Sequence, residues 1–195
     1  MDHAIEHSAR GASVLPRASS DEGGEPDVVL GAAGDIPMLE TMGAAWWLRR
    51  LAPDLRVRVV NVVDLMRLFP TAYHPHGMTT AEFVELFTAD KPVVFAFHGY
   101  QRAIHEIVHG HPNVDRIHVR GFNEQGTTTT PFLMCVLNSM SRFHLAAEAI
   151  RRVPRLGERA AELTAECESR IEESVRYAHE HMEDPPEIRD WVWTD

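Results

Sequence analysis

Cysteine is scarce in this sequence. Only two of the 195 residues are cysteines, Cys135 and Cys167. Two cysteines are too few for a disulfide framework or for a cysteine-rich zinc site. We therefore expect both to be buried thiols in a reducing compartment, which favours a cytoplasmic protein.

The sequence also lacks long apolar runs and an excess of positive charge. No stretch approaches the roughly 18 apolar residues of a membrane span, and the acidic, polar N-terminus does not resemble a secretory signal. The formal net charge of −10 argues against nucleic acid as a partner, because clustered Lys and Arg are needed to bind phosphate backbones. With 44% hydrophobic residues, the chain can bury one substantial core.

Residues 1–26 contain few of the apolar patterns found in the rest of the chain. The run from Ser19 to Pro26 is rich in residues that favour turns and linkers. We predict that residues 1–26 form a poorly packed lead-in and that residues 27–195 form the folded domain.

From residue 27 onward, segments typical of strands and of helices alternate. Three predicted strands are continuous runs rich in β-branched or aromatic residues and span 28–32, 56–63 and 92–97, and a fourth, 117–120, has an alternating pattern. The predicted helices span 38–51, a segment opened by a capping box at 79–82, 100–109, 132–153 with a break near 138–139, and 158–181. This order predicts an α/β fold of three layers, α/β/α, around a mostly parallel sheet of about five strands.

The most distinctive stretch runs from Arg120 to Phe132. It follows a predicted strand, and its glycines permit backbone angles closed to other residues. Four threonine hydroxyls precede the predicted helix, namely those of Thr127, Thr128, Thr129 and Thr130. Such a turn directs N–H groups and hydroxyls at one point, which suits an anion or a partner's carboxylate. The alternative is a capped loop without a ligand, in which Glu124 is a structural acceptor rather than a general acid.

Histidines outside this stretch form a second group of candidates. His74 and His76 flank a proline that stiffens their loop, whereas His98 and Tyr100 follow a buried strand, the usual place for site residues in α/β proteins. These imidazoles suit phosphate binding, proton transfer or hydrogen bonding between domains, since they titrate near neutral pH. The alternative for each is a histidine satisfied by nearby backbone.

One motif points to a metal. His105, Glu106 and His109 form an H-E-x-x-H pattern on a predicted helix, which places two imidazoles on one face to bind zinc, with the glutamate as general base. Pro112 and Asp115 occupy the positions where the extended metalloprotease pattern needs Gly and His. The default interpretation is therefore an amphipathic helix with two surface histidines.

Several segments resemble those of one family. The stretch from Arg120 to Phe132 is similar to a phosphoketolase signature that usually ends in Glu-Gly-Thr-Thr-Thr-Thr-Pro-Phe. The other matching segments are 27–30, 34–41, 57–68, 74–77, 91–100, 142–145 and 188–191. They correspond only to the C-terminal domain of those larger enzymes, so the resemblance implies the fold of a transketolase C-terminal domain. The sequence departs from the usual pattern at Asn123, Gln125 and Leu133, where the family commonly has Lys, Glu and Asp.

The resemblance implies an aldehyde-lyase of carbohydrate metabolism. Phosphoketolases cleave xylulose 5-phosphate or fructose 6-phosphate with phosphate to give acetyl phosphate, and they use thiamine diphosphate and magnesium. In the family, the Gly-Asp-Gly motif that binds the diphosphate and the glutamate that activates the cofactor lie in earlier domains. Here Gly34 and Asp35 are followed by Ile36. We therefore predict no catalytic, cofactor-binding or metal-binding residue in this chain.

The isolated chain is accordingly expected to be inactive and to serve assembly, interdomain packing or regulation. Its expected partners are other phosphoketolase domains or chains, including a second copy in a homodimer, and residues 1–26 would connect it to a preceding domain. The candidate histidines and the threonine loop would then contact partner domains. Two alternatives stay open: a stand-alone module that binds a phosphorylated metabolite through the threonine loop, and a zinc hydrolase.

Overall fold

A twisted sheet forms the centre of the protein. The computed structural model describes residues 2–123, 126 and 128–194. Within these residues, the strands are β1 (Ala12–Val14), β2 (Val28–Ala33), β3 (Val57–Val62), β4 (Val93–Phe97) and β5 (Ile117–Gly121). They lie in the order β1-β3-β2-β4-β5, and all neighbours are parallel except β1 and β3. The predicted mostly parallel sheet of about five strands is confirmed.

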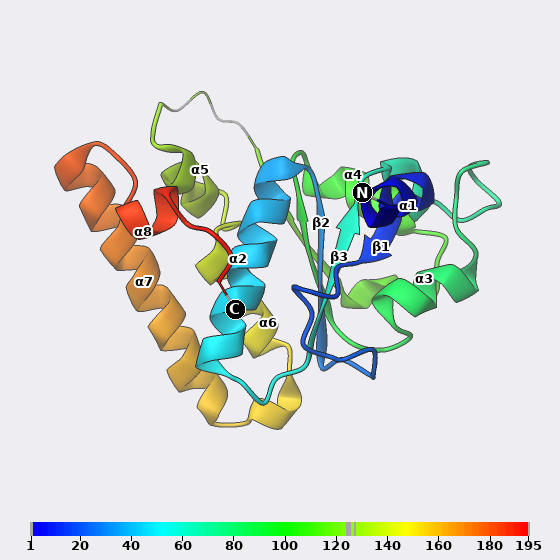
Figure 1. Cartoon of the computed structure of the whole chain (residues 1–195), viewed down its shortest axis with the longest axis horizontal. Coiled ribbons are helices and arrows are strands. Elements are labelled where there is room, and N and C mark those ends of the chain that lie inside the picture. The colour runs from blue at the N-terminus through cyan, green and yellow to red at the C-terminus, as the bar shows by residue number, and fades with distance from the viewer. Residues whose placement is uncertain (1, 124–125, 127, 195) are drawn as a thin grey trace.

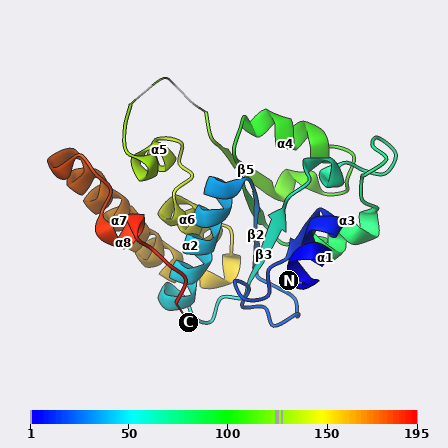
Figure 2. The same ribbon diagram turned by 45° about the horizontal axis from the view of Figure 1, so that its top comes forward.

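Helices cover both faces of this sheet (Figures 1 and 2). The described helices are α1 (Asp2–Arg10), α2 (Asp35–Leu51), α3 (Thr80–Phe87), α4 (Gln101–Val108), α5 (Pro131–Leu137), α6 (Arg142–Arg151), α7 (Arg159–His181) and α8 (Pro186–Arg189), with short 3-10 helices η1 (Leu65–Leu68), η2 (Val114–Arg116) and η3 (Pro154–Leu156). α2 and α6 pack on one face, and α3 and α4 pack on the other, which gives the three predicted layers. α7 packs against α5 and α6, outside the α2–α6 layer. No described helix is long and apolar enough to cross a membrane.

The segment before residue 27 is packed more closely than predicted. β1 pairs antiparallel with β3, with Ala12 opposite Val62, and it forms one end of the sheet. The Ser19 and Ser20 hydroxyls accept hydrogen bonds from backbone N–H groups of β3, at 2.9 and 3.0 Å. These serines, which suggest a linker in the sequence, satisfy donors at the strand edge instead. The prediction of a poorly packed lead-in is therefore wrong for this segment, whereas its origin as a connection between domains stays a prediction.

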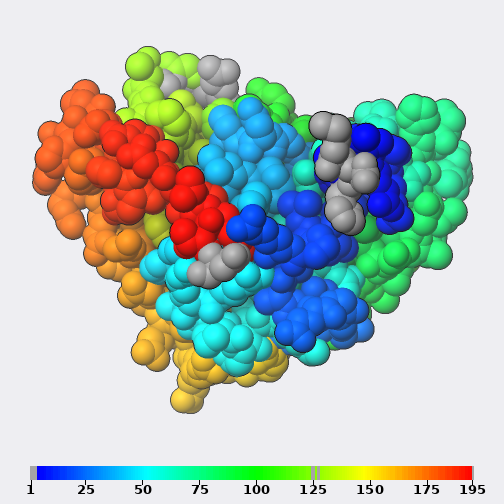
Figure 3. Space-filling model, viewed as in Figure 1, coloured from blue at the N-terminus to red at the C-terminus, as the bar shows by residue number. Residues whose placement is uncertain are grey.

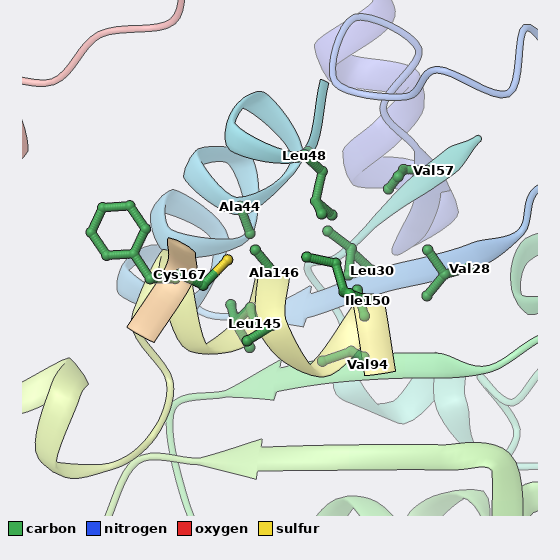
Figure 4. Close-up of a cluster of buried hydrophobic side chains, with 14 of the residues drawn as sticks. Val28, Leu30, Ala44, Leu48, Val57, Val94, Leu145, Ala146, Ile150 and Cys167 are labelled. Carbon is green, nitrogen blue, oxygen red and sulfur yellow. The ribbon is translucent and has the colours of Figure 1, made fainter. Parts of the chain in front are cut away.

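The first hydrophobic core lies between the sheet and the helices α2, α6 and α7. Figure 4 shows Leu30 of β2 close to Leu48 of α2 and Ile150 of α6, and all three side chains are fully buried. Burying an aliphatic side chain of this size contributes about 1.5–3 kcal/mol. Cys135 and Cys167 belong to the same core, and burial raises the pKa of their thiols to about 12 and about 11. Neither is a reactive thiolate at neutral pH.

The second core, on the opposite face, is aromatic and is anchored by α3. The rings of Phe83 and Phe87 lie 5.0 Å apart, and the imidazole of His111 stacks on Phe83 at 3.9 Å. α3 begins with the predicted capping box. The Thr79 hydroxyl accepts from the N–H of Glu82, and the Glu82 carboxylate accepts from the N–H of Thr79.

Residues 190–194, called here the C-terminal segment, lie across α2. Figure 3 shows this segment in red beside the light blue and cyan residues of α2. Trp191 packs edge-on against Trp46, with ring centroids 6.2 Å apart, and Trp193 lies 6.4 Å from Trp191. The indole N–H of Trp46 donates to the backbone carbonyl of Thr194 at 3.0 Å. Since Trp47 follows on the same helix, all four tryptophans of the chain belong to α2 or to this segment.

Candidate functional site

The carboxyl ends of β2 and β4 meet where the strand order reverses. From β2 the chain passes through α2 to β3 on one side, and from β4 it passes through α4 to β5 on the other side. In open parallel sheets, the loops diverge at this point and leave a crevice in which ligands bind. The β2 loop places Gly34 and Asp35 here, and the β4 loop places His98 and Tyr100.

Asp35 and His98 lie against each other where the β2 and β4 loops meet. Nδ1 of His98 lies 3.6 Å from Oδ1 of Asp35. The hydrogen bond from the Ile36 N–H lowers the pKa of the Asp35 carboxyl, and His98 adds to this effect. The ring of Phe122, which follows β5, packs edge-on against the His98 imidazole at 5.0 Å. Because the Asp35 side chain is 89% exposed, the pair is a surface contact rather than a shielded acid–base dyad.

Gly34 allows the two loops to approach closely. Its φ is +106°, and a Cβ at this position would lie 2.9 Å from the Cβ of His98. The backbone N–H of His98 donates to the carbonyl of Ala33 at 3.2 Å. Gly34 therefore lets the start of α2 lie directly against the loop that carries His98.

Apolar side chains flank this polar pair. A pocket of about 530 Å³ opens beside Asp35, between the start of α2 and the end of β3. Its apolar lining consists of Met38, Leu39, Met42, Val62 and Val63. Leu39 is 47% exposed and Val63 is 52% exposed, while Tyr100 on the neighbouring loop is 70% exposed. Exposed apolar groups of this size at one end of a sheet are typical of a surface that contacts protein.

The threonine loop ends in a helix cap. The Thr130 hydroxyl accepts from the backbone N–H of Leu133 at 3.3 Å, as expected for the start of α5. The N–H of Phe132 donates to the carboxylate of Asp184 at 3.0 Å. Asp184 follows the end of α7 and is buried. These two donors of the first turn are thus already bonded to the chain's own oxygen atoms.

An apolar groove adjoins this loop between α5 and α7. It has a volume of about 850 Å³. Leu137 and Met182 line it, and these residues are 58% and 83% exposed to solvent. Thr128 and Thr129 border the groove, whereas the predicted site residues Glu124 and Thr127 lie outside the described residues. In Figure 1, α5 and the start of α2 lie on the same side of the molecule.

Comparison with known proteins identifies the family. A family model described as the XFP C-terminal domain matches residues 1–193. A probable phosphoketolase of Bradyrhizobium diazoefficiens is 53% identical over 194 residues, which cover 99% of this chain and 24% of the relative. The chain belongs to the phosphoketolase family. It corresponds to the C-terminal domain of these proteins, as the sequence resemblance implied.

Other phosphoketolases agree with this assignment. Probable phosphoketolase 2 of Nostoc sp. is 50% identical and the probable phosphoketolase of Gloeobacter violaceus is 51% identical, each over 193 residues that cover 99% of this chain. The chain spans about a quarter of the length of these relatives, namely 24%. A solved split gene transketolase, an inactive β4 tetramer, has a TM-score of 0.45 and 18% identity, covering 74% of this chain and 42% of that one.

Three segments that resemble phosphoketolases meet in a buried ion pair that the sequence did not predict. Arg142 of α6 donates to the Glu40 carboxylate of α2 through Nη2 at 2.7 Å, through Nε at 3.1 Å and through its backbone N–H at 2.6 Å. Both side chains are 5% exposed. Trp191 from the C-terminal segment lies 5.0 Å from the guanidinium. The segments 34–41, 142–145 and 188–191 are thus joined by an interior contact.

His74 and His76 occupy a separate loop between η1 and α3. Nδ1 of His74 accepts from the N–H of His76 at 3.1 Å, and Arg67 donates to the His76 carbonyl at 3.0 Å. Nδ1 of His76 lies 3.6 Å from Asp64. Within the described residues, these local contacts hold the loop, and no contact joins either histidine to His98.

The zinc-hydrolase alternative is not supported. His105 is exposed on α4, which ends at Val108, so His109 falls just beyond the helix. A catalytic zinc site takes three protein ligands. The described part of the chain contains no group of three or more His, Cys, Asp or Glu side chains that could hold a metal ion.

Proposed function

We propose that this chain acts as the C-terminal domain of a thiamine-diphosphate-dependent phosphoketolase, an aldehyde-lyase. The enzyme would cleave xylulose 5-phosphate or fructose 6-phosphate with inorganic phosphate to acetyl phosphate and a shorter aldose phosphate. The observation that carries this proposal is about 50% identity to phosphoketolases along 99% of the chain. The setting would be the cytoplasm, where these sugar phosphates are metabolised.

The described residues do not fit the family cofactor. The acid after Gly34 is Asp35, whose carboxylate is exposed and lies against His98, and no described cluster of acidic or histidine side chains could hold the accompanying divalent metal. We therefore derive no catalytic step from this domain. The reacting groups are assigned to the other domains of a complete phosphoketolase.

Within such an enzyme, the role proposed for this domain is to pack against the other domains or against a second chain of a homodimer. The support is two sets of exposed apolar side chains. The groove between α5 and α7 exposes Leu137 and Met182, and the pocket beside Asp35 exposes Leu39 and Val63. Exposed apolar patches favour protein contact.

The absence of chemistry in the isolated chain is directly testable. The purified chain is mixed with thiamine diphosphate, magnesium, phosphate and fructose 6-phosphate, and acetyl phosphate is measured. We expect no product above the background without protein. Turnover by this chain alone would contradict the proposal that the reacting groups lie elsewhere.

The packing role is tested by supplying the domain separately. The Bradyrhizobium diazoefficiens relative is truncated to remove the region that matches this chain, and the chain is added back. We expect the addition to raise acetyl phosphate formation and to yield a complex in size-exclusion chromatography. The double variant Leu137→Glu/Met182→Glu should lose both effects, because it places charges in the groove.

Ile5→Glu serves as the matched control, since Ile5 on α1 is 62% exposed and lies outside the groove. It should restore activity as well as the unchanged chain does. Equal loss in both variants, or full activity in the groove variant, would show that the groove is not the contact surface.

A further inference from the structure

The open edge of the sheet carries a polar pocket that the proposed packing role does not use. β5 pairs with β4 on one side, and no described strand pairs with its other side. A pocket of about 480 Å³ lies along this free edge, lined by residues of β5 and of the ends of α4 and α6. It shares no lining residue with the groove beside the threonine loop.

Two side chains of β5 enter this pocket from the sheet. Ile117 and Val119 belong to the second core. Because side chains alternate along a strand, His118 and Arg120 face the opposite way, and both line the pocket. A strand of five residues with charged side chains is a poor template for pairing with another strand. The pocket is therefore better suited to a small ligand than to an extended peptide.

One buried carboxylate holds two arginines at this pocket. Arg120 donates to Oε2 of Glu148 at 2.8 Å, and Arg152 donates to Oε1 through Nε and Nη2 at 3.0 and 2.7 Å. Burial alone would raise the pKa of Glu148. The hydrogen bonds and charges of both arginines outweigh this effect and lower the pKa, so the carboxylate is ionised at neutral pH. The three groups together keep one positive charge. Each guanidinium has five N–H donors, and most of them are not used by Glu148.

Three imidazoles, two from the end of α4 and one from β5, complete the lining. His105, His109 and His118 all border the pocket, and none makes a hydrogen bond within the described residues. Burial lowers the pKa of His118, the charges of Arg152 and Arg120 add to this effect, and the charge of Glu148 opposes it. Asp115 is the only carboxylate besides Glu148 among the lining residues described.

We propose that this pocket binds the phosphate group of a small phosphorylated metabolite. Guanidinium and imidazole donors reach it from α4, from β5 and from the end of α6, which suits the several oxygen atoms of a tetrahedral phosphate better than a planar carboxylate. Its volume lies within the usual range for small-molecule sites. The lining sets two arginines and three imidazoles against two carboxylates, Glu148 and Asp115.

The test is titration calorimetry on the full 195-residue chain. The probes are inorganic phosphate and fructose 6-phosphate, with fructose as the uncharged counterpart and succinate as a dicarboxylate. We expect saturable binding of both phosphate probes at one site, no binding of fructose and weaker binding of succinate. Arg152→Gln should weaken fructose 6-phosphate binding by about tenfold or more, because charge-assisted hydrogen bonds are lost.

Arg151→Gln provides a matched control. Arg151 is the preceding residue and is paired with Glu168 at 2.6 Å, outside the pocket lining. The Arg151→Gln substitution removes one positive charge from the same end of α6, and it should change fructose 6-phosphate binding by less than about twofold. Arg152→Gln should stay folded because Arg120 still neutralises Glu148, and circular dichroism checks this. His118→Gln, which leaves that carboxylate fully paired, should also weaken binding.

Each of the other outcomes overturns the inference. Absence of saturable binding of both phosphate probes removes the site. Equal weakening by Arg151→Gln and Arg152→Gln shows only general charge attraction, and equal binding of succinate removes the preference for phosphate. Binding that is lost in Thr128→Val but unchanged in Arg152→Gln places the site at the threonine loop.

Discussion

The two faces of the sheet are stabilised by different physical means. On the face covered by α2 and α6, helices with many alanines pack closely, and Glu40 and Arg142 form an ion pair inside the apolar layer. A Cβ at Gly43 would lie about 3.0 Å from the Arg142 side chain, so a small residue is needed for that pair to fit. The face covered by α3 and α4 relies instead on stacked rings, led by Phe83 and His111. The stability of the first face thus depends on the placement of one buried ion pair. The stability of the second face depends on how well large rings fill the space between the helices and the sheet.

The largest expected effect comes from breaking the ion pair of the first face. Glu40→Ala leaves the Arg142 guanidinium buried without its partner, and we expect the free energy of unfolding to fall by about 3–5 kcal/mol. Urea denaturation followed by circular dichroism measures this loss. Glu168→Ala breaks the exposed pair with Arg151 and should cost at most about 1 kcal/mol. Similar losses in the two variants would remove the special role of the buried pair.

Acid should weaken the first face through His144. Burial lowers the pKa of this histidine to about 4, and the charges of Arg120 and Arg151 add to the effect. Because the unfolded chain binds the proton more readily, this contribution is fully present above about pH 6.5 and is lost as the pH falls to about 4, amounting to roughly 3 kcal/mol.

Denaturation of the unchanged chain and of His144→Gln between pH 7.5 and 4.5 should show a smaller pH dependence in the variant. On the second face, burial also lowers the pKa of His111, so His111→Gln should change the pH dependence in the same direction. A His144→Gln variant that keeps the full slope would show that other groups cause it.

Helix caps should matter about equally on both faces. Thr79→Ala removes the capping box of α3, and Ser141→Ala removes the hydroxyl that accepts from the N–H of His144 at the start of α6. Each substitution should lower the free energy of unfolding by about 1 kcal/mol, within a range of about 0.5–2. Thermal or urea unfolding measures both. A several-fold difference would show that tertiary contacts of one cap exceed its helix contribution.

The smallest effects should come from deleting one methyl group in each core. Ile150→Val on α6 and Ile104→Val on α4 change fully buried positions on opposite faces. Each should cost about 0.5–1.5 kcal/mol. A larger loss at Ile104 than at Ile150 would support the view that the second face depends more strongly on volume.

Local patterns predicted the elements of this fold well. The strands β2 to β5 follow from short runs of β-branched and aromatic residues, and the break between α5 and α6 falls at Asn138 and Ser139, as predicted. Ser139 has a φ of +51°, which ends the helix. The capping box at Thr79 is a local signal as well. The segment before residue 27 was missed because β1 has only three residues, too short for a periodic pattern.

Contacts between segments far apart in the sequence were beyond local patterns. Glu40 and Arg142 stand 102 positions apart, and Asp184 reaches the start of α5 from 52 positions away. The pocket beside β5 depends on that strand lying at the end of the sheet, which strand order alone decides. The sequence pattern at His105 and His109 suggested a metal site only as an alternative to two surface histidines, and the structure places both at an arginine-containing pocket.

The gathering of every tryptophan on α2 and the C-terminal segment has a spectroscopic consequence. Emission from Trp46 and Trp191 reports the docking of that segment and not the state of α3 or α4. A melting curve recorded by intrinsic fluorescence would therefore follow one side of the molecule, while far-ultraviolet dichroism follows all helices. Coincidence of the two curves would establish that both sides lose their structure as one cooperative unit.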